Sequence, residues 1–271
     1  MLRGGFERQR GSLHSIRVPS ITDQAIVIRR WDFSETSQTV SLLTREHGIV
    51  RGLAKGSKRD KSDFSGGLDL LTEGEIVAII KPGRELATLT AWHLQKIHRM
   101  LRENLTVNRA AMYMADLVHH LLIDHDPHAA VFDALSDALA LLDQDVSRSE
   151  EALLKLQWST LCEAGYQPEL RRDAHTGDAL TESSATLAFS ASAGGVLAEA
   201  DETPTPDRWR VRRETIELLR DLAAGANVRE RAQESMRRAN RLLASYAREI
   251  IGSEPASLRW AFPDLAPARD R

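Results

Sequence analysis

Residues 24–54 read QAIVIRRWDFSETSQTVSLLTREHGIVRGLA, and the pattern of this stretch decides the fold of the first third of the chain. Three short apolar runs are bounded by polar or glycine-containing segments, at 25–30, 39–44 and 49–55. Runs of this length between turn residues are typical of β-strands. In the third run the small residues Val50, Gly52 and Ala54 alternate with larger or charged ones. This period of two predicts a half-exposed strand whose small side chains face a narrow barrel interior.

Two further strands are predicted downstream. An apolar run at 76–80 meets a second one at 86–90 across Lys81-Pro-Gly-Arg84, where proline and glycine supply the backbone angles of a tight turn. Five strands within about 70 residues, without an internal repeat, match the size of an OB-fold. That fold is a partly open five-stranded barrel that commonly binds oligonucleotides or oligosaccharides.

From Leu94 onward apolar residues recur every three or four positions, which predicts amphipathic helices. Between 171 and 205 this periodicity is lost, so we expect a loop-rich insert with one hairpin around 187–189 and 196–197. Glycines at 165, 225 and 252 stand where helices are expected to end. The predicted helical segments are 107–122, 131–142, 153–161, 211–222 and 232–250.

The predicted fold class is therefore α+β, with an N-terminal five-stranded OB-fold barrel followed by a mostly α-helical domain. At 271 residues the chain is long for one small domain, so two compact units with separate cores are expected. The expected organisation is an N-terminal extension at 1–20, the barrel at 21–93, the helical domain at 94–260 with the hairpin insert at 171–205, and a C-terminal tail at 261–271.

Charge is distributed unevenly along the chain. The totals of 36 basic and 39 acidic residues leave a net charge of −3, which by itself does not suggest a nucleic-acid partner. By segment, the net charge is +3 over 1–93, −10 over 94–206 and +4 over 207–271. The near-neutral total therefore hides two basic regions that could bind phosphates on either side of an acidic middle.

Cysteine usage and hydropathy indicate the compartment. The single cysteine, Cys162, excludes an intrachain disulfide and fits a reducing environment. Because it lies in an apolar helical stripe, we expect it in a core rather than as a nucleophile. No run approaches the roughly 18–20 consecutive apolar residues of a membrane helix, and the first 20 residues lack the apolar centre of a signal peptide. A soluble cytoplasmic protein is expected.

Three motifs carry a resemblance to a known family. They are Ala25-Ile-Val-Ile-Arg-Arg30, Leu42-Leu-Thr-Arg-Glu-His-Gly48 and Leu53-Ala-Lys-Gly-Ser57. Their order and spacing resemble the N-terminal domain of RecO, a bacterial family of recombination mediators, and weaker similarity continues to about residue 260. The resemblance implies an OB-fold followed by a helical domain in a DNA-repair protein that has no catalytic residues and needs no cofactor.

The resemblance also implies activities and partners. Members of this family bind single- and double-stranded DNA, anneal complementary strands, and contact the acidic C-terminal tail of single-stranded-DNA-binding protein. They work with RecR to load RecA, so the chain is expected at the nucleoid and without a membrane partner. Many relatives hold zinc with four cysteines in the second domain, whereas the matching positions here read Asp173-Ala-His-Thr-Gly177 and Ala198-Glu-Ala-Asp201. Because a tetrahedral thiolate site cannot form without cysteines, we expect no metal and a hairpin held by packing.

The densest basic stretch lies between Arg45 and Lys61, on the predicted third strand and the loop after it. Such a stretch on an OB-fold could neutralise several phosphates, and the alternative is a solvated basic loop. Arg29 and Arg30 continue the first strand with opposite orientations, so at most one of them is expected to face DNA. The candidate DNA-binding residues are Arg29, Arg30, Arg45, Arg51, Lys55, Lys58, Arg59 and Lys61.

Aromatic residues and a second arginine group offer further candidates. Trp31, Phe33 and Trp92 could stack on bases, each stacked base contributing roughly 1–3 kcal/mol, or could close the ends of the barrel instead. Arginines after residue 207 could hold an acidic partner tail or extend the DNA surface. The alternative is that they form the solvated faces of two helices, paired with nearby glutamates. The candidates in this second group are Arg208, Arg212, Arg213, Arg237, Arg238 and Arg241.

A histidine- and aspartate-rich run, His119-His-Leu-Leu-Ile-Asp-His-Asp-Pro-His128, supports a rival hypothesis. Its composition is found in metal-dependent phosphohydrolases, which would make the protein an enzyme with a nucleic-acid-binding domain. Against this, Asp126-Pro127 ends a helix, and neighbouring helix positions such as His119 and His120 point about 100° apart. The other histidines, among them His93, His98 and His175, stand at no recognisable ligand spacing. The mediator hypothesis, which requires no acid, base or nucleophile, is preferred.

Overall fold

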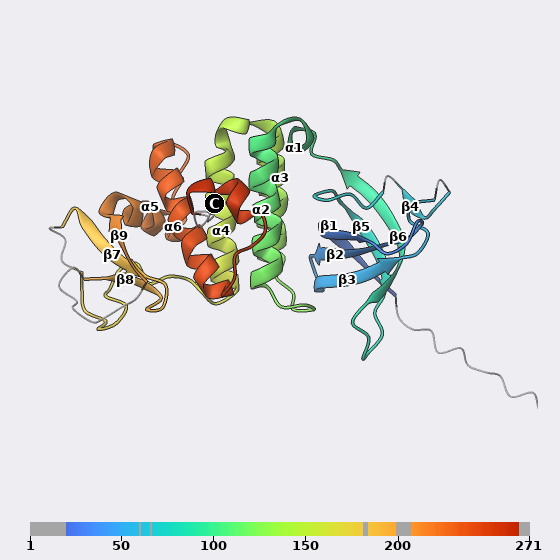
Figure 1. The fold of residues 1–271 in the computed structure, drawn as a ribbon, viewed down its shortest axis with the longest axis horizontal. Helices are drawn as coiled ribbons and strands as arrows, with labels where there is room; N and C mark the ends of the chain where they lie inside the picture. The colour runs from blue at the N-terminus through green and yellow to red at the C-terminus, as the bar shows by residue number, and fades with distance from the viewer. Residues whose placement is uncertain (1–19, 60, 66, 181–183, 199–206, 266–271) are drawn as a thin grey trace, which may run out of the picture.

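The structure is a computed structural model that describes residues 20–59, 61–65, 67–180, 184–198 and 207–265. The molecule is elongated, with a β-barrel at one end, helices in the middle and a small β-sheet at the other end (Figure 1). This is the predicted α+β arrangement. The N-terminal extension predicted at 1–20 lies outside the described residues, apart from Ser20.

The barrel consists of β1 (Ser20–Asp32), β2 (Gln38–Thr44), β3 (Gly48–Ala54), β5 (Glu73–Ile79) and β6 (Ala87–Lys96). The strands pair in the order β3-β2-β1-β5-β6, and parallel pairing between β3 and β6 closes the ring. A two-residue strand, β4 (Phe64–Ser65), pairs with β6. The five predicted strands are confirmed. The barrel extends beyond the predicted boundary at 93, because β6 continues to Lys96 with exposed side chains that lack an apolar pattern.

Strands β1, β2 and β3 are apolar on both faces. One set of side chains fills the interior of the barrel, namely Ala25, Val27, Val40, Leu42, Val50 and Ala54. The residues between them are also buried, but in a core shared with the helices, namely Ile26, Ile28, Leu43 and Ile49. The run at 25–28 is continuously apolar because successive side chains of a strand enter two different cores.

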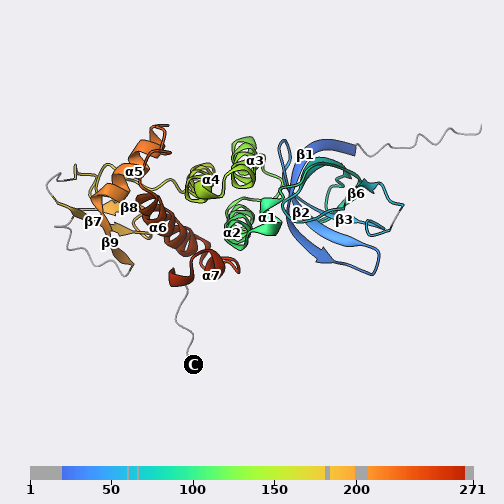
Figure 2. The same ribbon diagram turned by 90° about the horizontal axis from the view of Figure 1, so that it is seen from above.

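The middle of the molecule is helical. Its elements are α1 (Met100–Glu103), α2 (Leu105–Leu121), α3 (Ala129–Gln144), η1 (Val146–Arg148), α4 (Ser149–Glu163), α5 (Arg213–Ala223) and α6 (Gln233–Ile251). Asn104 begins α2 by accepting hydrogen bonds from the backbone amides of Thr106 and Val107. Seen from above, α2 and α3 lie between the barrel and helices α4, α5 and α6 (Figure 2). None of the helices described is long and apolar enough to cross a membrane.

The far end of the molecule is a three-stranded sheet in the order β8-β7-β9. Its strands are β7 (Thr186–Ser190), β8 (Gly195–Leu197) and β9 (Arg208–Arg212). The predicted hairpin is confirmed as β7 and β8. The assignment of Val211 to a helix was wrong, because Arg-Trp-Arg-Val-Arg alternates with the period of a strand and pairs with β7 along its whole length.

The C-terminal segment is packed rather than forming a tail from residue 261. It contains α7 (Leu258–Ala261) and η2 (Pro263–Leu265). Phe262 is buried, and its ring lies edge-on to the ring of Tyr113 with 5.1 Å between centroids. The rest of the predicted tail, 266–271, lies outside the described residues.

Candidate nucleic-acid interface

Three of the predicted DNA-binding arginines, one on β1, one after β2 and one on β3, face the helices. Each forms an ion pair with an acidic residue of the helical middle, in the pairs Arg29–Asp116, Arg45–Asp133 and Arg51–Asp124. The pair on α3 is bidentate, since Nε and Nη2 of Arg45 lie 3.0 and 2.9 Å from the two carboxylate oxygens of Asp133. The basic front and the acidic middle of the sequence therefore neutralise each other where the barrel meets the helices. We call this contact of β1–β3 with α2, α3 and the loop 122–128 the seam.

A buried cluster surrounds Arg29 at the seam. Asp116 Oδ2 accepts hydrogen bonds from the backbone amide and the hydroxyl of Ser257, at 3.1 and 2.6 Å. Nη2 of Arg29 also lies 3.0 Å from Nε2 of His120. Burial, together with the charge of Arg29, lowers the pKa of His119 to about 4. A neutral imidazole can pack beside a guanidinium without charge repulsion. His119 and His120 are therefore explained as packing partners of Arg29 at the seam.

The Thr-Arg-Glu-His-Gly motif forms the turn between β2 and β3. Oδ2 of the buried Asp23 accepts a hydrogen bond from the backbone amide of Glu46 at 3.0 Å and lies 2.7 Å from Nδ1 of His47. Gly48 follows with φ of +67°, a left-handed conformation that favours glycine. The motif therefore forms a single tight turn, which the Asp23 carboxylate stabilises through Glu46 and His47.

The same turn receives the loop that follows α2. The backbone amide of His125 donates to the carbonyl of Ile49 at 3.1 Å, and Ile49 and Asp124 form a parallel bridge. A Cβ on Gly48 would lie 2.2 Å from the carbonyl oxygen of Asp126. Both the backbone angle and the close approach of the loop thus require glycine at this position.

The exposed basic and aromatic residues gather at another part of the barrel, where the β1–β2 hairpin meets the loop after β3. We call this surface the hairpin end, and it comprises Trp31, Phe33, Lys55, Lys58, Arg59 and Lys61. The two rings are 48% and 62% exposed, although exposed large aromatics are costly to leave in water. Flat rings interleaved with cations are the composition of a surface that binds single-stranded nucleic acid.

Hydrogen bonds hold the loop after β3 against the hairpin. Lys58 Nζ lies 2.6 Å from Asp32 Oδ1, and the Lys58 amide donates to the carbonyl of Thr36 at 3.1 Å. The hydrogen bond from Lys58 lowers the pKa of Asp32. Among the described residues, Lys55, Arg59 and Lys61 form no ion pair, so three cations of the hairpin end remain available to a ligand.

Two predicted contacts lie elsewhere. Trp92 is fully buried in the barrel core, so the prediction that it stacks on a base is corrected in favour of the alternative that it fills the barrel. A Cβ on Gly74 of β5 would lie 2.4 Å from the His93 carbonyl oxygen and 2.9 Å from the Trp92 ring, so the close approach of β6 requires glycine there. Arg30 is exposed but forms an ion pair with Asp69.

The second arginine group is partly paired along its own helices. Arg237 and Arg238 both reach Glu234, and Arg238 also lies 3.1 Å from Glu214 of α5. Arg241 lies 3.3 Å from Asp264 of η2. The alternative of solvated helix faces therefore applies to part of this group. The arginines on the strand and at the start of α5 differ, because Arg208 and Arg213 donate to backbone carbonyls of the insert.

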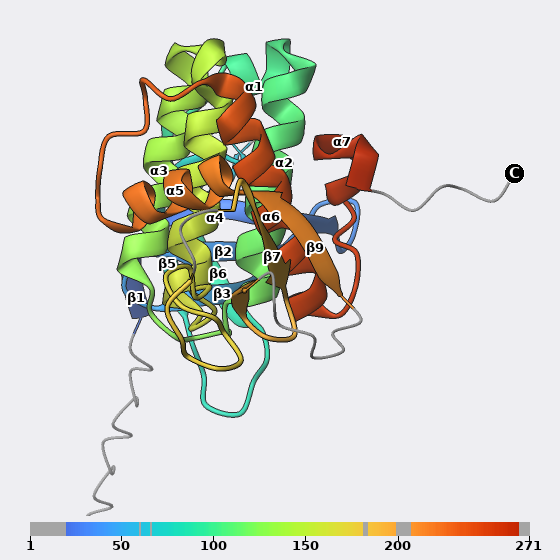
Figure 3. The ribbon, with the colours of Figure 1, turned by 90° about the vertical axis from the view of Figure 1, so that its left-hand side faces the viewer.

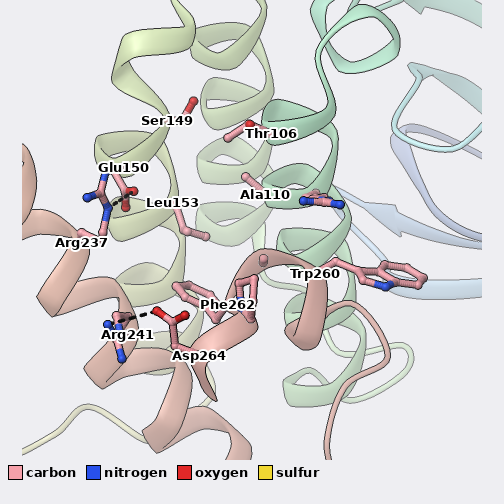
Figure 4. A pocket seen from close by; sticks show the side chains of 13 residues that line it. Thr106, Ala110, Ser149, Glu150, Leu153, Arg237, Arg241, Trp260, Phe262 and Asp264 are labelled. Atoms are coloured by element: carbon pink, nitrogen blue, oxygen red, sulfur yellow. Dashed lines mark hydrogen bonds and ion pairs between the residues drawn. The ribbon is translucent and has the colours of Figure 1, made fainter. Parts of the chain in front are cut away.

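A cavity of about 300 Å³ opens between α2, α4, α6 and the C-terminal segment (Figure 4). Its apolar wall is formed by Ala110, Leu153 and Phe262. Around it stand Arg237 and Arg241, together with Arg109, which has no ion-pair partner among the described residues, and the half-exposed Trp260. Sequence patterns pointed to neither Arg109 nor Trp260, because the cavity unites segments about 150 residues apart and no local pattern marks it.

The insert does not fit a thiolate zinc site. Asp173, which stands where the resemblance to the family predicts a zinc-ligating cysteine, is 2% exposed and accepts hydrogen bonds from the backbone amides of His175, Thr176 and Ala198. One carboxylate therefore links the turn at 173–177 to the end of β8. The position is occupied by a hydrogen-bonded crosslink in addition to the predicted packing.

The rival metal hypothesis finds no support in the geometry. In the part of the chain that the structure describes, no three His, Cys, Asp or Glu side chains are grouped so as to hold a metal ion. Asp124 instead pairs with Arg51, and His120 lies against Arg29. Burial raises the pKa of the Cys162 thiol to about 11, which is unsuited to a nucleophile.

Comparison with known proteins identifies the family. A family model described as Recombination protein O N terminal matches residues 18–98, and one described as Recombination protein O C terminal matches residues 102–259. DNA repair protein RecO of Rhodopirellula baltica is 34% identical over 200 residues, which cover 74% of each chain. DNA repair protein RecO of Salinibacter ruber is 32% identical over 257 residues, covering 93% of this chain and 92% of the relative.

A third relative, DNA repair protein RecO of Cutibacterium acnes, is 30% identical over 240 residues, covering 84% of this chain and 93% of its own. The two family models meet where β6 ends and α1 begins, which is where the barrel gives way to the helices. The chain belongs to the RecO family of DNA repair and recombination proteins, which are recombination mediators and not enzymes.

Proposed function

We propose that this chain binds DNA through the hairpin end of its barrel and anneals complementary strands. The observation that carries the proposal is the exposure of two rings, Trp31 and Phe33, beside cations that no described carboxylate neutralises. Bases stack on such rings regardless of sequence, and the cations bind the phosphates. Base pairing then supplies the specificity, and the protein lowers the repulsion between two phosphate backbones.

The ion pairs of the seam divide the candidate DNA-binding residues into two sets. Arg29, Arg45 and Arg51 are already matched by carboxylates, so we assign them to the junction of barrel and helices. Lys55, Arg59 and Lys61 are the proposed phosphate contacts, and Lys58 positions their loop through Asp32. The proposal covers single- and double-stranded DNA, since both present phosphates to such a surface.

Charge reversal tests the DNA surface. Lys55→Glu with Arg59→Glu should weaken the binding of a labelled oligonucleotide at least roughly tenfold, and should reduce the log–log salt slope by about 0.7 for each phosphate that the variant no longer neutralises. Fluorescence anisotropy over a range of salt concentrations measures both quantities. The matched control is Lys81→Glu with Arg84→Glu, two exposed cations on the β5–β6 turn of the same barrel. If both double variants weaken binding equally, the loss comes from the changed net charge of the protein, and the assignment of Lys55 and Arg59 as phosphate contacts is refuted.

The cavity between α2, α4 and α6 is the proposed site for an acidic partner tail. Its apolar wall suits a hydrophobic chain end, and Arg109, which has no ion-pair partner among the described residues, suits the carboxylates that precede it. Arg237 and Arg241 stand beside it but already pair with Glu150 and Asp264. On this proposal the occupant is the C-terminal tail of single-stranded-DNA-binding protein. The protein would then act at the nucleoid, in the cytoplasm, where with RecR it loads RecA onto DNA coated by that partner.

Titration with the tail peptide tests this site. Arg109→Glu should weaken the binding of the C-terminal peptide of the cognate single-stranded-DNA-binding protein roughly tenfold or more, because it reverses an unpaired charge at the cavity. Arg99→Glu, which changes another exposed arginine just before α1, is the control. Calorimetry measures both affinities, and an unchanged affinity in Arg109→Glu would place the tail elsewhere.

An annealing assay tests the activity as a whole. Complementary strands coated with the cognate single-stranded-DNA-binding protein should anneal faster with this chain present, without ATP. Arg109→Glu should slow annealing of coated strands but leave annealing of bare strands unchanged, since only the former requires the partner tail. Absence of any acceleration on bare strands would refute the annealing proposal.

A further inference from the structure

A second groove lies at the far end of the molecule, between β9, the start of α5, α6 and η2. It encloses about 530 Å³, a size within the roughly 300–1,000 Å³ typical of ligand sites. Strand β9 runs alongside α6 in this region (Figure 3). Strand β9 and helix α5, which contribute to its lining, lie at the opposite end of the elongated molecule from the barrel (Figure 1).

The lining of this groove is strongly basic. Five arginines line it against one carboxylate, that of Asp264. The arginines are Arg210, Arg212, Arg238, Arg241 and Arg248. The side chain of Arg212 has no ion pair or hydrogen bond among the described residues, and the side chain of Arg210 donates only to the hydroxyl of Thr186, at 3.3 Å. Neither guanidinium group forms an ion pair with a described carboxylate, although the charge of Arg212 contributes to lowering the pKa of Glu214, and both groups attract an anion.

Two buried donors in the groove lack an acceptor. Thr215 is 1% exposed, and its Oγ1 has no hydrogen-bond partner among the described residues. Nε of Arg238 is also buried without a partner in the same part of the chain. Buried donors are nearly always satisfied in native proteins, and an oxyanion in this groove would supply the missing acceptor to both the Thr215 hydroxyl and Nε of Arg238, whose other nitrogens donate to Glu214 and Glu234. A phosphate has enough oxygens to accept from both donors and from Arg212.

An aromatic ring in the same groove identifies the kind of anion. Trp209 is only partly buried, and its indole lies parallel to the buried Phe189 ring, with 5.9 Å between centroids and 4° between planes. Phe189 is held in turn by the edge of Tyr246. A rigid ring beside unpaired arginines suits a nucleotide, which presents a base and a phosphate together. An acidic peptide would use the arginines but not the ring.

We propose that this groove binds a nucleotide of single-stranded DNA, with its phosphate at Arg212, Arg238 and Thr215 and its base on Trp209. The inference rests on the proposed annealing function and extends it. An annealing protein must hold two strands, and the hairpin end together with this groove provides two separate places for them. Each strand is held by its backbone and by one stacking platform, which leaves most bases free to pair.

The test separates the two sites. In the Lys55→Glu, Arg59→Glu background, short oligothymidylate should still bind, and adding Arg212→Glu should weaken that residual binding about tenfold. Thr215→Val, which removes the orphaned hydroxyl at nearly constant volume, should weaken it severalfold. The control for charge is Arg229→Glu, an exposed arginine between α5 and α6. In the otherwise wild-type protein, Arg212→Glu should abolish annealing while the hairpin end still binds one strand.

A spectroscopic measurement distinguishes a nucleotide from other anions. Oligothymidylate should quench tryptophan fluorescence in the barrel variant, and Trp209→Phe, which keeps a ring on Phe189, should remove that quenching. Residual binding that is equal in Arg212→Glu and Arg229→Glu would overturn the proposal. So would an Arg212→Glu variant that loses the acidic tail peptide but keeps the oligonucleotide. If instead the barrel variant binds DNA normally and Arg212→Glu does not, the hairpin-end proposal fails and the groove stands.

Discussion

At the scale of single residues, three buried aspartates hold separate segments of this molecule together. Asp23 holds the turn between β2 and β3, Asp116 joins Arg29 to the C-terminal segment, and Asp173 crosslinks the insert. Each accepts two or more hydrogen bonds, which is the condition under which a charge can be buried without a large penalty. In the insert, the carboxylate of Asp173 links the turn at 173–177 to the end of β8.

Replacement of the insert carboxylate should therefore be costly. Asp173→Ala leaves three backbone amides without their acceptor and is expected to lower the free energy of unfolding by about 2–3 kcal/mol. Urea denaturation measures the decrease, with Asp178→Ala at a neighbouring exposed position as the control. A chelator should leave the unfolding midpoint of the unmodified protein unchanged. A midpoint that falls on chelation would show that metal, and not Asp173, holds the insert.

At the scale of elements, the first three strands serve two cores at once. Their inner faces fill the barrel, and their outer faces pack on α2 and α3 with Ile26, Ile28 and Ile49. The turn between β2 and β3 adds a backbone contact with the loop after α2. The family motif at 44–48 is thus placed at the seam, where it joins the barrel to the helices, and the phosphate contacts we propose lie beyond it, after β3.

A pair of glycine substitutions separates backbone strain from this contact. Gly48→Ala combines a left-handed φ with a Cβ that would collide with the Asp126 carbonyl, so we expect about 2–4 kcal/mol of destabilisation. Gly83→Ala, also at positive φ but with nothing within 4 Å of the new Cβ, should cost only about 1–2 kcal/mol. Thermal denaturation measures both, and equal destabilisation would mean that the loop moves aside freely.

At the scale of the whole molecule, the barrel and helices are not the two independent units expected from chain length. The barrel has its own interior, but its outer face belongs to the core that runs through the helices to the terminal sheet. Glu73 of β5 also links the barrel to the helices. Its carboxylate accepts a hydrogen bond from the Ser136 hydroxyl of α3 at 2.8 Å, and it lies 2.9 Å from both His98 Nε2 and Lys96 Nζ. The molecule is therefore expected to unfold as one unit.

The same carboxylate predicts a dependence of stability on acid. Burial raises the pKa of Glu73, but hydrogen bonds from His98, Lys96 and Ser136 outweigh this effect and hold the pKa at about 2. The unfolded chain, with an ordinary value of 4.5, binds the proton first, so the free energy of unfolding falls as pH decreases from 4.5 towards 2. Glu73→Gln should remove about 2–3 kcal/mol of that fall.

Urea denaturation at a series of pH values measures this effect. Glu85→Gln, at an exposed position on the β5–β6 turn, serves as the control and should retain the acid dependence of the unmodified protein. A Glu73→Gln variant with the same pH profile as the control would contradict the role assigned to this carboxylate.

Local pattern was sufficient for the elements with strong periodicity. The five main strands, the three helices at 107–161 and the hairpin followed from alternation, helical stripes and turn residues, because these depend on which neighbours a residue has along the chain. Strand β9 was misassigned and the C-terminal segment was taken for a tail. Their apolar residues, such as Val211 and Phe262, are few, and they are buried by partners far away in the chain.

The sequence by itself determined the family, the barrel and the absence of a thiolate metal site, since each depends on residue identities and spacings. Only the tertiary structure decided which basic residues are free. Arg45 and Lys55 look equivalent in the sequence, yet one is bound by Asp133 and the other has no ion-pair partner among the described residues. Ion pairs, cavities and orphaned donors such as Thr215 depend on distances across the fold, and no local pattern encodes those distances.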